Sequence, residues 1–196
     1  MRILAMSVGS AMALSGAAWA EQCEFQASHF LEQAVEEFDQ SAEGWRSLAH
    51  RGCYAEVADL IRDYRRLHGA SLDARRQSDL HWHEGQMHAY AGDYAPAIEQ
   101  FTAAFPDNTS NRVSILKRDA VVAFLRRDRA ALLSVRAALL DLPEPPDFQD
   151  AVNRLRGHVP DQNLPKWPLG LDELDNYLRC FDYPYAIAYE GACESQ

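Results

Sequence analysis

The side chains best suited to chemistry in this sequence form a run of imidazoles between residues 81 and 88. His81 and His88 lie seven residues apart and share one face of a helix, with Glu84 between them and His83 close by. Three imidazoles and a carboxylate can ligate a metal ion if another helix helps. The spacing differs from the H-E-x-x-H pattern of helical zinc sites. The alternative interpretation is that these histidines are half-buried helix residues held by hydrogen bonds.

Motifs for other kinds of catalysis are missing from the sequence. It has no G-x-S-x-G nucleophile turn, no P-loop and no glycine pattern of a dinucleotide-binding site. The paired carboxylates Glu36 with Glu37 and Asp172 with Glu173 fall in helical stretches, where they are typical of helix caps or solvated faces. We therefore expect no enzyme, no catalytic residue and no cofactor. A metal-binding protein or hydrolase centred on the histidine cluster is the alternative.

The first twenty residues have the parts of a cleavable signal peptide. Arg2 supplies a positive charge, and an uncharged, mostly apolar run follows at residues 3–14. Ala18-Trp19-Ala20 then has the small-x-small pattern that signal peptidase reads. The apolar run is shorter than the ~20 residues that span a bilayer, so we expect cleavage rather than a retained anchor. The working chain would begin near Glu21 and act in the periplasm or outside the cell.

Four cysteines follow this segment, at positions 23, 53, 180 and 193. An even number of cysteines in an exported chain predicts two disulfides, for which three pairings exist on paper. The most economical pairs are Cys23–Cys53 and Cys180–Cys193, because each closes a short loop and a helical hairpin would bring the first pair together. Metal ligation is the rival use, but the sequence has no C-x-x-C and the expected compartment is oxidising.

The chain is acidic, with a formal net charge of -10, or -11 once the single positive charge of Arg2 is removed. Nucleic-acid binding needs a basic surface, so this charge argues against it and against adhesion to anionic membranes. No second apolar stretch of ~18 residues occurs, so we expect no membrane insertion of the mature chain. A basic partner or a cationic ligand remains compatible with the charge.

Apolar residues recur at helical spacing through most of the chain. Glycines, prolines and capping residues mark the ends of the expected helices. A loop is expected at residues 106–108, and residues 160–170 carry three prolines that predict irregular structure. The expected helices are 28–38, 45–52, 54–69, 71–91, 94–105, 111–126, 128–141, 147–156 and 172–180.

The aromatic tail after Cys180 has a different pattern. Its large side chains alternate with period two from Phe181 to Tyr189, which predicts an extended segment, and Pro184 rules out a central strand. We expect this tail to cap the open end of the helical stack, pinned by the Cys180–Cys193 bridge, because a terminal repeat must cover its apolar face. The alternatives are that it binds a partner or folds back into the protein's own groove.

The segment 84–105 resembles a tetratricopeptide repeat. The matching residues are Gly85 in the first helix, Gly92-Asp93-Tyr94 at the turn, and Ala97, Phe101 and Ala104 in the second helix. Small residues let the two helices approach closely, and the glycine allows a tight reversal. Weaker copies place their turns at residues 52–54 and 127–129, so the resemblance covers residues 41–140.

This resemblance implies an all-α fold of antiparallel helix pairs, stacked as a short solenoid that binds a protein or peptide in the cell envelope. The concave face would be lined by the first helix of each pair. Trp82 is the best anchor on this face, although it could equally pack in the core. A protein that plugs another protein's site would look the same in sequence. The partner-binding residues carried over by this frame are Arg46, Asp79, Trp82, His83, Gln86, Lys117 and Arg118.

The predicted organisation is a signal peptide at 1–20, helical repeats at 21–141, and a C-terminal part at 142–196 that packs on the same domain. This C-terminal part contains one helix and the irregular aromatic cap. We expect no boundary between independent domains, because no low-complexity linker divides the chain.

Overall fold

The computed structural model describes residues 23–193, and the predicted signal peptide lies outside this part of the chain. Residues 23–193 are helical, as predicted, and contain no β-strand, only an isolated bridge between Arg156 and Val159. Within the same range, no helix is long and apolar enough to cross a membrane.

The helices fall close to the expected ranges, because prolines, glycines and capping side chains end them where the sequence indicates. Two short 3-10 turns lie at Gly69–Ser71 and Asp161–Asn163. The α-helices are α2 (Ala27–Leu31), α3 (Val35–Gln40), α4 (Arg46–Ala49), α5 (Tyr54–His68), α6 (Ala74–Ala91), α7 (Tyr94–Ala104), α8 (Arg112–Leu125), α9 (Arg129–Leu140), α10 (Phe148–Leu155), α11 (Leu171–Arg179) and α12 (Tyr185–Glu190).

The single helix predicted for residues 28–38 is instead two short helices, α2 and α3. The break lies at Ala34, which has an extended backbone with φ -63° and ψ 152°. The buried Tyr64 of α5 donates its hydroxyl to the Gln33 carbonyl at 2.9 Å. A tertiary hydrogen bond thus supports the break, and no local pattern predicts it.

Three consecutive helix pairs share the same turn. Gly52, Gly92 and Arg127 follow α4, α6 and α8, and each has a positive φ of 85°, 85° and 57°. The next residue donates its amide to a carbonyl five positions back in all three turns, as in a Schellman motif. Arg127 therefore takes the left-handed conformation in the one turn that lacks a glycine.

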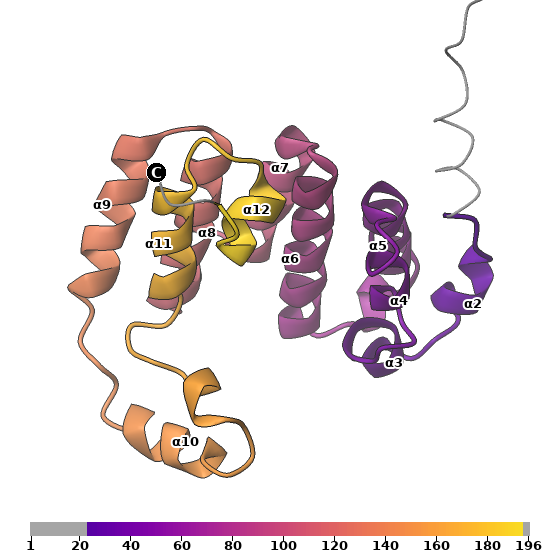
Figure 1. The fold of residues 1–196 in the computed structure, drawn as a ribbon. Coiled ribbons are helices and arrows are strands. Elements are labelled where there is room, and N and C mark those ends of the chain that lie inside the picture. The colour runs from indigo at the N-terminus through magenta and orange to yellow at the C-terminus, as the bar shows by residue number, and fades with distance from the viewer. Residues whose placement is uncertain (1–22, 194–196) are drawn as a thin grey trace, which may run out of the picture.

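The helix pairs α4–α5, α6–α7 and α8–α9 follow one another along the chain, with α6 packed on α5 and α8 packed on α7 (Figure 1). The packing of α6 on α7 is close, because a Cβ atom at Gly85 would lie 3.0 Å from the ring of Phe101. Buried apolar residues form two clusters. One lies around α5 and includes Leu80 and Met87 of α6, and the other joins α7, α8 and α9 to the C-terminal helices.

The aromatic tail is not extended, so that prediction was wrong. Residues 185–190 form α12, which begins after Pro184 and ends at Gly191. Tyr185 is fully buried against Tyr90, Phe101 and Tyr177, so tertiary packing of the aromatic rings decides the conformation. The buried residues of this part share one apolar cluster with those of α7, α8 and α9.

Both predicted disulfides are present. Cys23 bonds to Cys53, and Cys180 bonds to Cys193. The first bond ties the start of the described chain to the beginning of α5. The second closes the loop that carries α12 back onto the end of α11.

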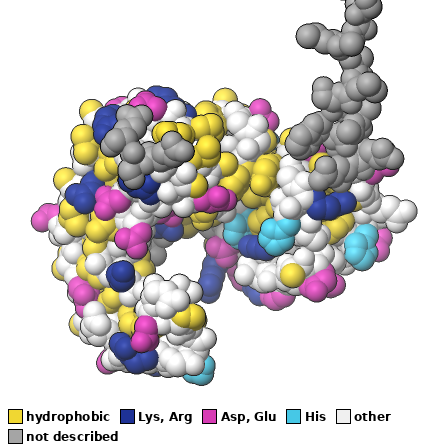
Figure 2. Space-filling model, viewed as in Figure 1, with side chains coloured by type: hydrophobic (Ala, Val, Ile, Leu, Met, Phe, Trp, Pro, Cys, Tyr) yellow, Lys and Arg dark blue, Asp and Glu magenta, His cyan; other side chains and the backbone are white. Residues whose placement is uncertain are grey.

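The segment that contains α10 projects from the rest of the molecule (Figure 1). It is held at its base by Trp167, whose ring packs on Phe148 and whose Nε1–H donates to the Leu142 carbonyl at 3.0 Å. Figure 2 shows a recess between this projection and the N-terminal helices, with charged side chains at its border.

Candidate functional site

Two adjoining hollows, each of about 600 Å³, meet at Arg46 and His83, which line both of them. The first, here called the polar hollow, lies between α3, α4 and the first half of α6. It is lined by Val35, Glu36, Asp39, Gln40, Arg46, Asp73, Arg75, Arg76, Asp79 and His83. The second, the aromatic hollow, is lined by Trp45, Arg46, Ala49, His50, Tyr54, His83, Gln86, Met87, Tyr90, Tyr189 and Glu190.

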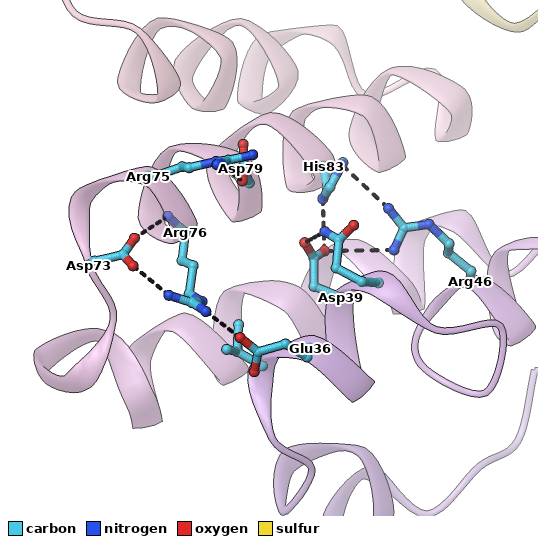
Figure 3. Close-up of a pocket in the computed structure, with 10 residues that line it drawn as sticks. Glu36, Asp39, Arg46, Asp73, Arg75, Arg76, Asp79 and His83 are labelled. Carbon is cyan, nitrogen blue, oxygen red and sulfur yellow. Dashed lines mark hydrogen bonds and ion pairs between the residues drawn. The ribbon is translucent and has the colours of Figure 1, made fainter. Parts of the chain in front are cut away.

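Asp39 is the buried centre of the polar hollow (Figure 3). Its Oδ1 accepts from Trp45 Nε1 at 2.9 Å and from His83 Nδ1 at 2.8 Å, and Gln40 donates to its Oδ2 at 2.6 Å. Because an ionised carboxylate only accepts hydrogen bonds, these contacts fix Nδ1 of His83 as the protonated nitrogen. Nε2 of the same ring is left to face Arg46.

The charge state of Asp39 follows from these partners. Burial alone would raise its pKa, but the hydrogen bond and charge of His83, the Trp45 donor and the charge of Arg46 outweigh burial and lower the pKa below its usual value. The carboxylate is therefore ionised at neutral pH. It holds together α3, α4 and α6, the three helices that surround the polar hollow.

Arg46 connects the two hollows. Its guanidinium stacks over the ring of Trp45 at 4.2 Å, and its Nη2 lies 3.5 Å from His83 Nε2. The Asp39 carboxylate is 3.8 Å from Nη1, an atom that is buried and makes no hydrogen bond to the described residues. Burial lowers the pKa of Arg46, and the charge of Asp39 offsets part of that effect. The Arg46 side chain is 29% exposed, so part of its guanidinium remains open to a ligand oxygen although Nη1 is buried.

The other arginines of the polar hollow are engaged by carboxylates at its rim (Figure 3). Arg76 bonds to both Glu36 and Asp73, so it joins the start of α6 to α3. Arg75 lies 3.9 Å from Asp79 and is almost fully exposed. Arg46 and His83 differ from these rim arginines because they border both hollows.

The aromatic hollow has walls of a different character. Tyr54 of α5 stacks on Tyr90 of α6 with their ring centres 5.0 Å apart, and Tyr189 of α12 lies 6.1 Å from Tyr90. Burial raises the pKa of Tyr90 and of Tyr189, so both phenols are neutral at physiological pH. The hollow therefore offers flat, uncharged surfaces next to the charge of Arg46.

Four of the seven predicted partner-binding residues lie together in this region. Arg46, Asp79 and His83 line the polar hollow, and Gln86 lines the aromatic hollow with Arg46 and His83. His83 and Arg46 come from different helix pairs, and their approach depends on the packing of α4 beside α6.

Trp82 and Lys117 lie apart from the hollows but contact each other. The half-buried Trp82 ring packs on Phe101 and Phe105, with ring centres 4.7 and 5.5 Å away, and Lys117 Nζ lies 5.7 Å above it. Lys117 also pairs with Glu173 of α11 at 3.7 Å. Trp82 thus joins α6 to α7, and its ring is mainly part of the packing.

Arg118 was expected on an exposed binding face, but it is buried. Its guanidinium donates to the Phe105 carbonyl at 2.5 Å and pairs with Asp107 and Asp119 at 2.9 and 2.6 Å. It is therefore part of the connection between α7 and α8. The helical spacing could not distinguish this buried position from an exposed one.

The histidines of the sequence cluster do not converge on one point. His81 Nδ1 lies 2.8 Å from Gln100 Oε1, whereas His88 Nε2 lies 3.9 Å from the buried carboxylate of Glu84. Glu84 is paired with Arg65 at 2.5 Å. Among residues 23–193, no group of three or more His, Cys, Asp or Glu side chains is placed to hold a metal ion.

Burial sets the charge of this second network. It lowers the pKa of His81 and of His88, and it raises the pKa of Glu84 against the opposing charge of Arg65. Both imidazoles therefore remain neutral at neutral pH. Their contacts link α5, α6 and α7 within the helix stack.

Asp39, Trp45 and the tyrosines of the aromatic hollow were missed as site residues. Asp39 lies 44 positions before its partner His83, and no local spacing signals such a contact. Tyr189 belongs to the tail that was expected to be extended. Comparison with protein-family models, with curated proteins and with solved structures finds no match.

Proposed function

We propose that this chain is an exported binding module that holds a segment of a protein partner in the polar and aromatic hollows. The observation that carries the proposal is the position of Arg46 and His83 on the boundary between the hollows. Asp39 and Trp45 hold both groups in place before any partner arrives. Preorganised groups lose little freedom on binding, which favours affinity.

The two hollows indicate what kind of segment fits. The partly exposed guanidinium of Arg46 suits an acidic side chain, because a guanidinium binds carboxylates with good geometry. The tyrosine walls suit a large apolar or aromatic side chain beside it. The proposed partner is therefore a peptide segment with an acidic residue next to a bulky apolar one.

Three features support a tetratricopeptide-like arrangement of the helices. Successive helix pairs repeat along the chain, their turns share one backbone geometry, and Gly85 allows the ring of Phe101 to approach closely. Repeat proteins of this kind use extended concave faces to bind partners. The hollows lie beside the first helices of two such pairs, where that arrangement would place the binding face.

The proposed location is the periplasm or the cell exterior. Two disulfides join all four cysteines of the chain, and such bonds persist in oxidising compartments. The signal-peptide pattern of residues 1–20 supports the same location. N-terminal sequencing of the purified protein tests it, and a protein that begins at Met1 would contradict export by cleavage.

The binding test uses Arg46→Gln, which removes the charge from a side chain that is 29% exposed. The immobilised protein and the variant are offered a cell-envelope extract, and the captured proteins are identified and quantified. We expect at least a tenfold loss of the specific partner, since a charged hydrogen bond in an interface often contributes about 2 kcal/mol or more.

The matched control is Arg62→Gln on α5. Arg62 pairs with Asp59 and Asp63 and lines neither hollow. The Arg62→Gln variant should capture as much of the partner as the unmodified protein does. Equal capture by Arg46→Gln and the unmodified protein would refute the assignment of the site.

A further inference from the structure

The outer face of α9 is apolar and exposed. Ala130, Leu133, Ala137 and Leu140 form one stripe along it, and the two leucines are 51% and 49% exposed. The opposite face of the helix carries Leu132 and Leu139, which are buried in the core. Large contiguous apolar patches on a protein surface mark interaction sites.

The C-terminal tail does not cover this stripe. It packs on the other side, where Arg136 of α9 pairs with Asp175 of α11 at 2.6 Å and α12 lies against α6. Figure 1 shows α9 as the outermost helix at its end of the stack. Within residues 23–193, the tail thus leaves the outer face of α9 uncovered.

The charges around the stripe have opposite signs at its two ends. Arg126 and Arg129 lie at the beginning of α9 beside the N-cap Asp128, and Asp141 and Glu144 lie beyond its last turn. Arg127 instead donates to the Phe181 and Tyr183 carbonyls of the C-terminal tail. Residues 126–144 carry four arginines and three carboxylates, a formal charge of +1, whereas the whole chain carries -10. Two negatively charged copies would repel each other over most of their surface, but not at the outer face of α9.

We propose that the outer face of α9 docks against the same face of a second copy, with the two helices antiparallel across a two-fold axis. A two-fold interface must be complementary to itself. The antiparallel arrangement meets this condition, because it places the arginine end of each helix beside the carboxylate end of the other. It also covers both apolar stripes at once.

The size of the contact sets the expected affinity. The 12 residues of α9 form a helix about 18 Å long and about 10 Å wide, so two such faces bury on the order of 400 Å² in total. Stable interfaces usually bury about 1,200–2,000 Å². The dimer is therefore weak, and it forms when the local concentration is high.

Sedimentation equilibrium tests this interface, with the protein at concentrations from about 10 μM to about 1 mM. The weight-average mass of the unmodified protein should rise toward that of a dimer over this range. Leu133→Glu with Leu140→Glu should weaken association by about tenfold or more, since two-fold symmetry places each change in the interface twice. Circular dichroism checks that the variant keeps its helices.

Leu67→Glu on α5 is the matched control, because Leu67 is also a leucine on a helix surface and is 63% exposed. This variant should associate as the unmodified protein does. The interface is refuted if the unmodified protein stays monomeric up to 1 mM, or if Leu67→Glu weakens association as much as the α9 changes do. Partner capture through Arg46 is a separate measurement that neither result affects.

Discussion

Replacing Asp39 with asparagine tests whether this buried carboxylate organises the candidate site. The substitution keeps the size of the side chain but removes its charge and one acceptor oxygen. In the unmodified protein, Trp45 and His83 donate to Oδ1 of Asp39, and Gln40 donates to Oδ2. The side-chain oxygen of an asparagine can still accept from Trp45 and His83. Its NH2 group then faces the NH2 group of Gln40, and these two donors cannot bond to each other.

The expected loss of stability follows from these contacts. Hydrogen bonds to a charged group contribute about 1.5–3 kcal/mol each, and the variant loses one such bond and weakens two. We therefore expect Asp39→Asn to lower the free energy of unfolding by about 2–4 kcal/mol. With a urea slope of about 2 kcal/mol/M, the unfolding midpoint should fall by about 1–2 M.

The pH dependence gives the prediction a second test. The pKa of Asp39 is lowered in the folded state, so its stabilisation is present above the unfolded pKa and is lost as the pH falls through the folded pKa. The difference between the unmodified protein and Asp39→Asn should therefore be largest at neutral pH. It should shrink once the pH falls below about 4.

Urea unfolding followed by circular dichroism, with the disulfides intact, measures both effects. Asp59→Asn is the control, because Asp59 is 59% exposed and its pair with Arg62 should contribute at most about 1 kcal/mol. A loss below about 1 kcal/mol for Asp39→Asn, or an equal loss for the control, would contradict the central role of this carboxylate.

Three further changes test the packing around the site. Replacing Cys180 and Cys193 with serine should cost about 3 kcal/mol of stability, because the bond closes a loop with a sequence separation of 13 residues, and non-reducing urea unfolding measures it. Gly85→Ala should cost about 1–3 kcal/mol, since its Cβ would lie 3.0 Å from the fully buried ring of Phe101; a neutral effect in thermal unfolding would contradict this. Trp82→Ala should lower the unfolding free energy by about 2–3 kcal/mol, because the ring packs on two phenylalanines, and an unchanged urea midpoint would show that it is a free surface residue.

Local patterns in the sequence determined most of the helices. Apolar side chains at helical spacing mark the buried face of α5, and Gly92 ends α6 because it takes a positive φ at no steric cost. The pairs Cys23–Cys53 and Cys180–Cys193 were also predictable, because each joins cysteines that are close in sequence or brought together by a hairpin. These features depend on neighbouring residues, and a sequence records neighbours directly.

The tertiary structure alone decided the features that depend on distant contacts. Asp39 and His83 are 44 positions apart in the sequence. Their contact gives His83 a structural role, although its neighbours in the sequence suggested a metal ligand. The tail is a helix although its aromatic residues alternate as in an extended segment. Burial of the Tyr185 ring among other aromatic rings outweighs this alternation. The sequence thus determined which segments are helical, and packing between segments decided which of their side chains meet in the hollows.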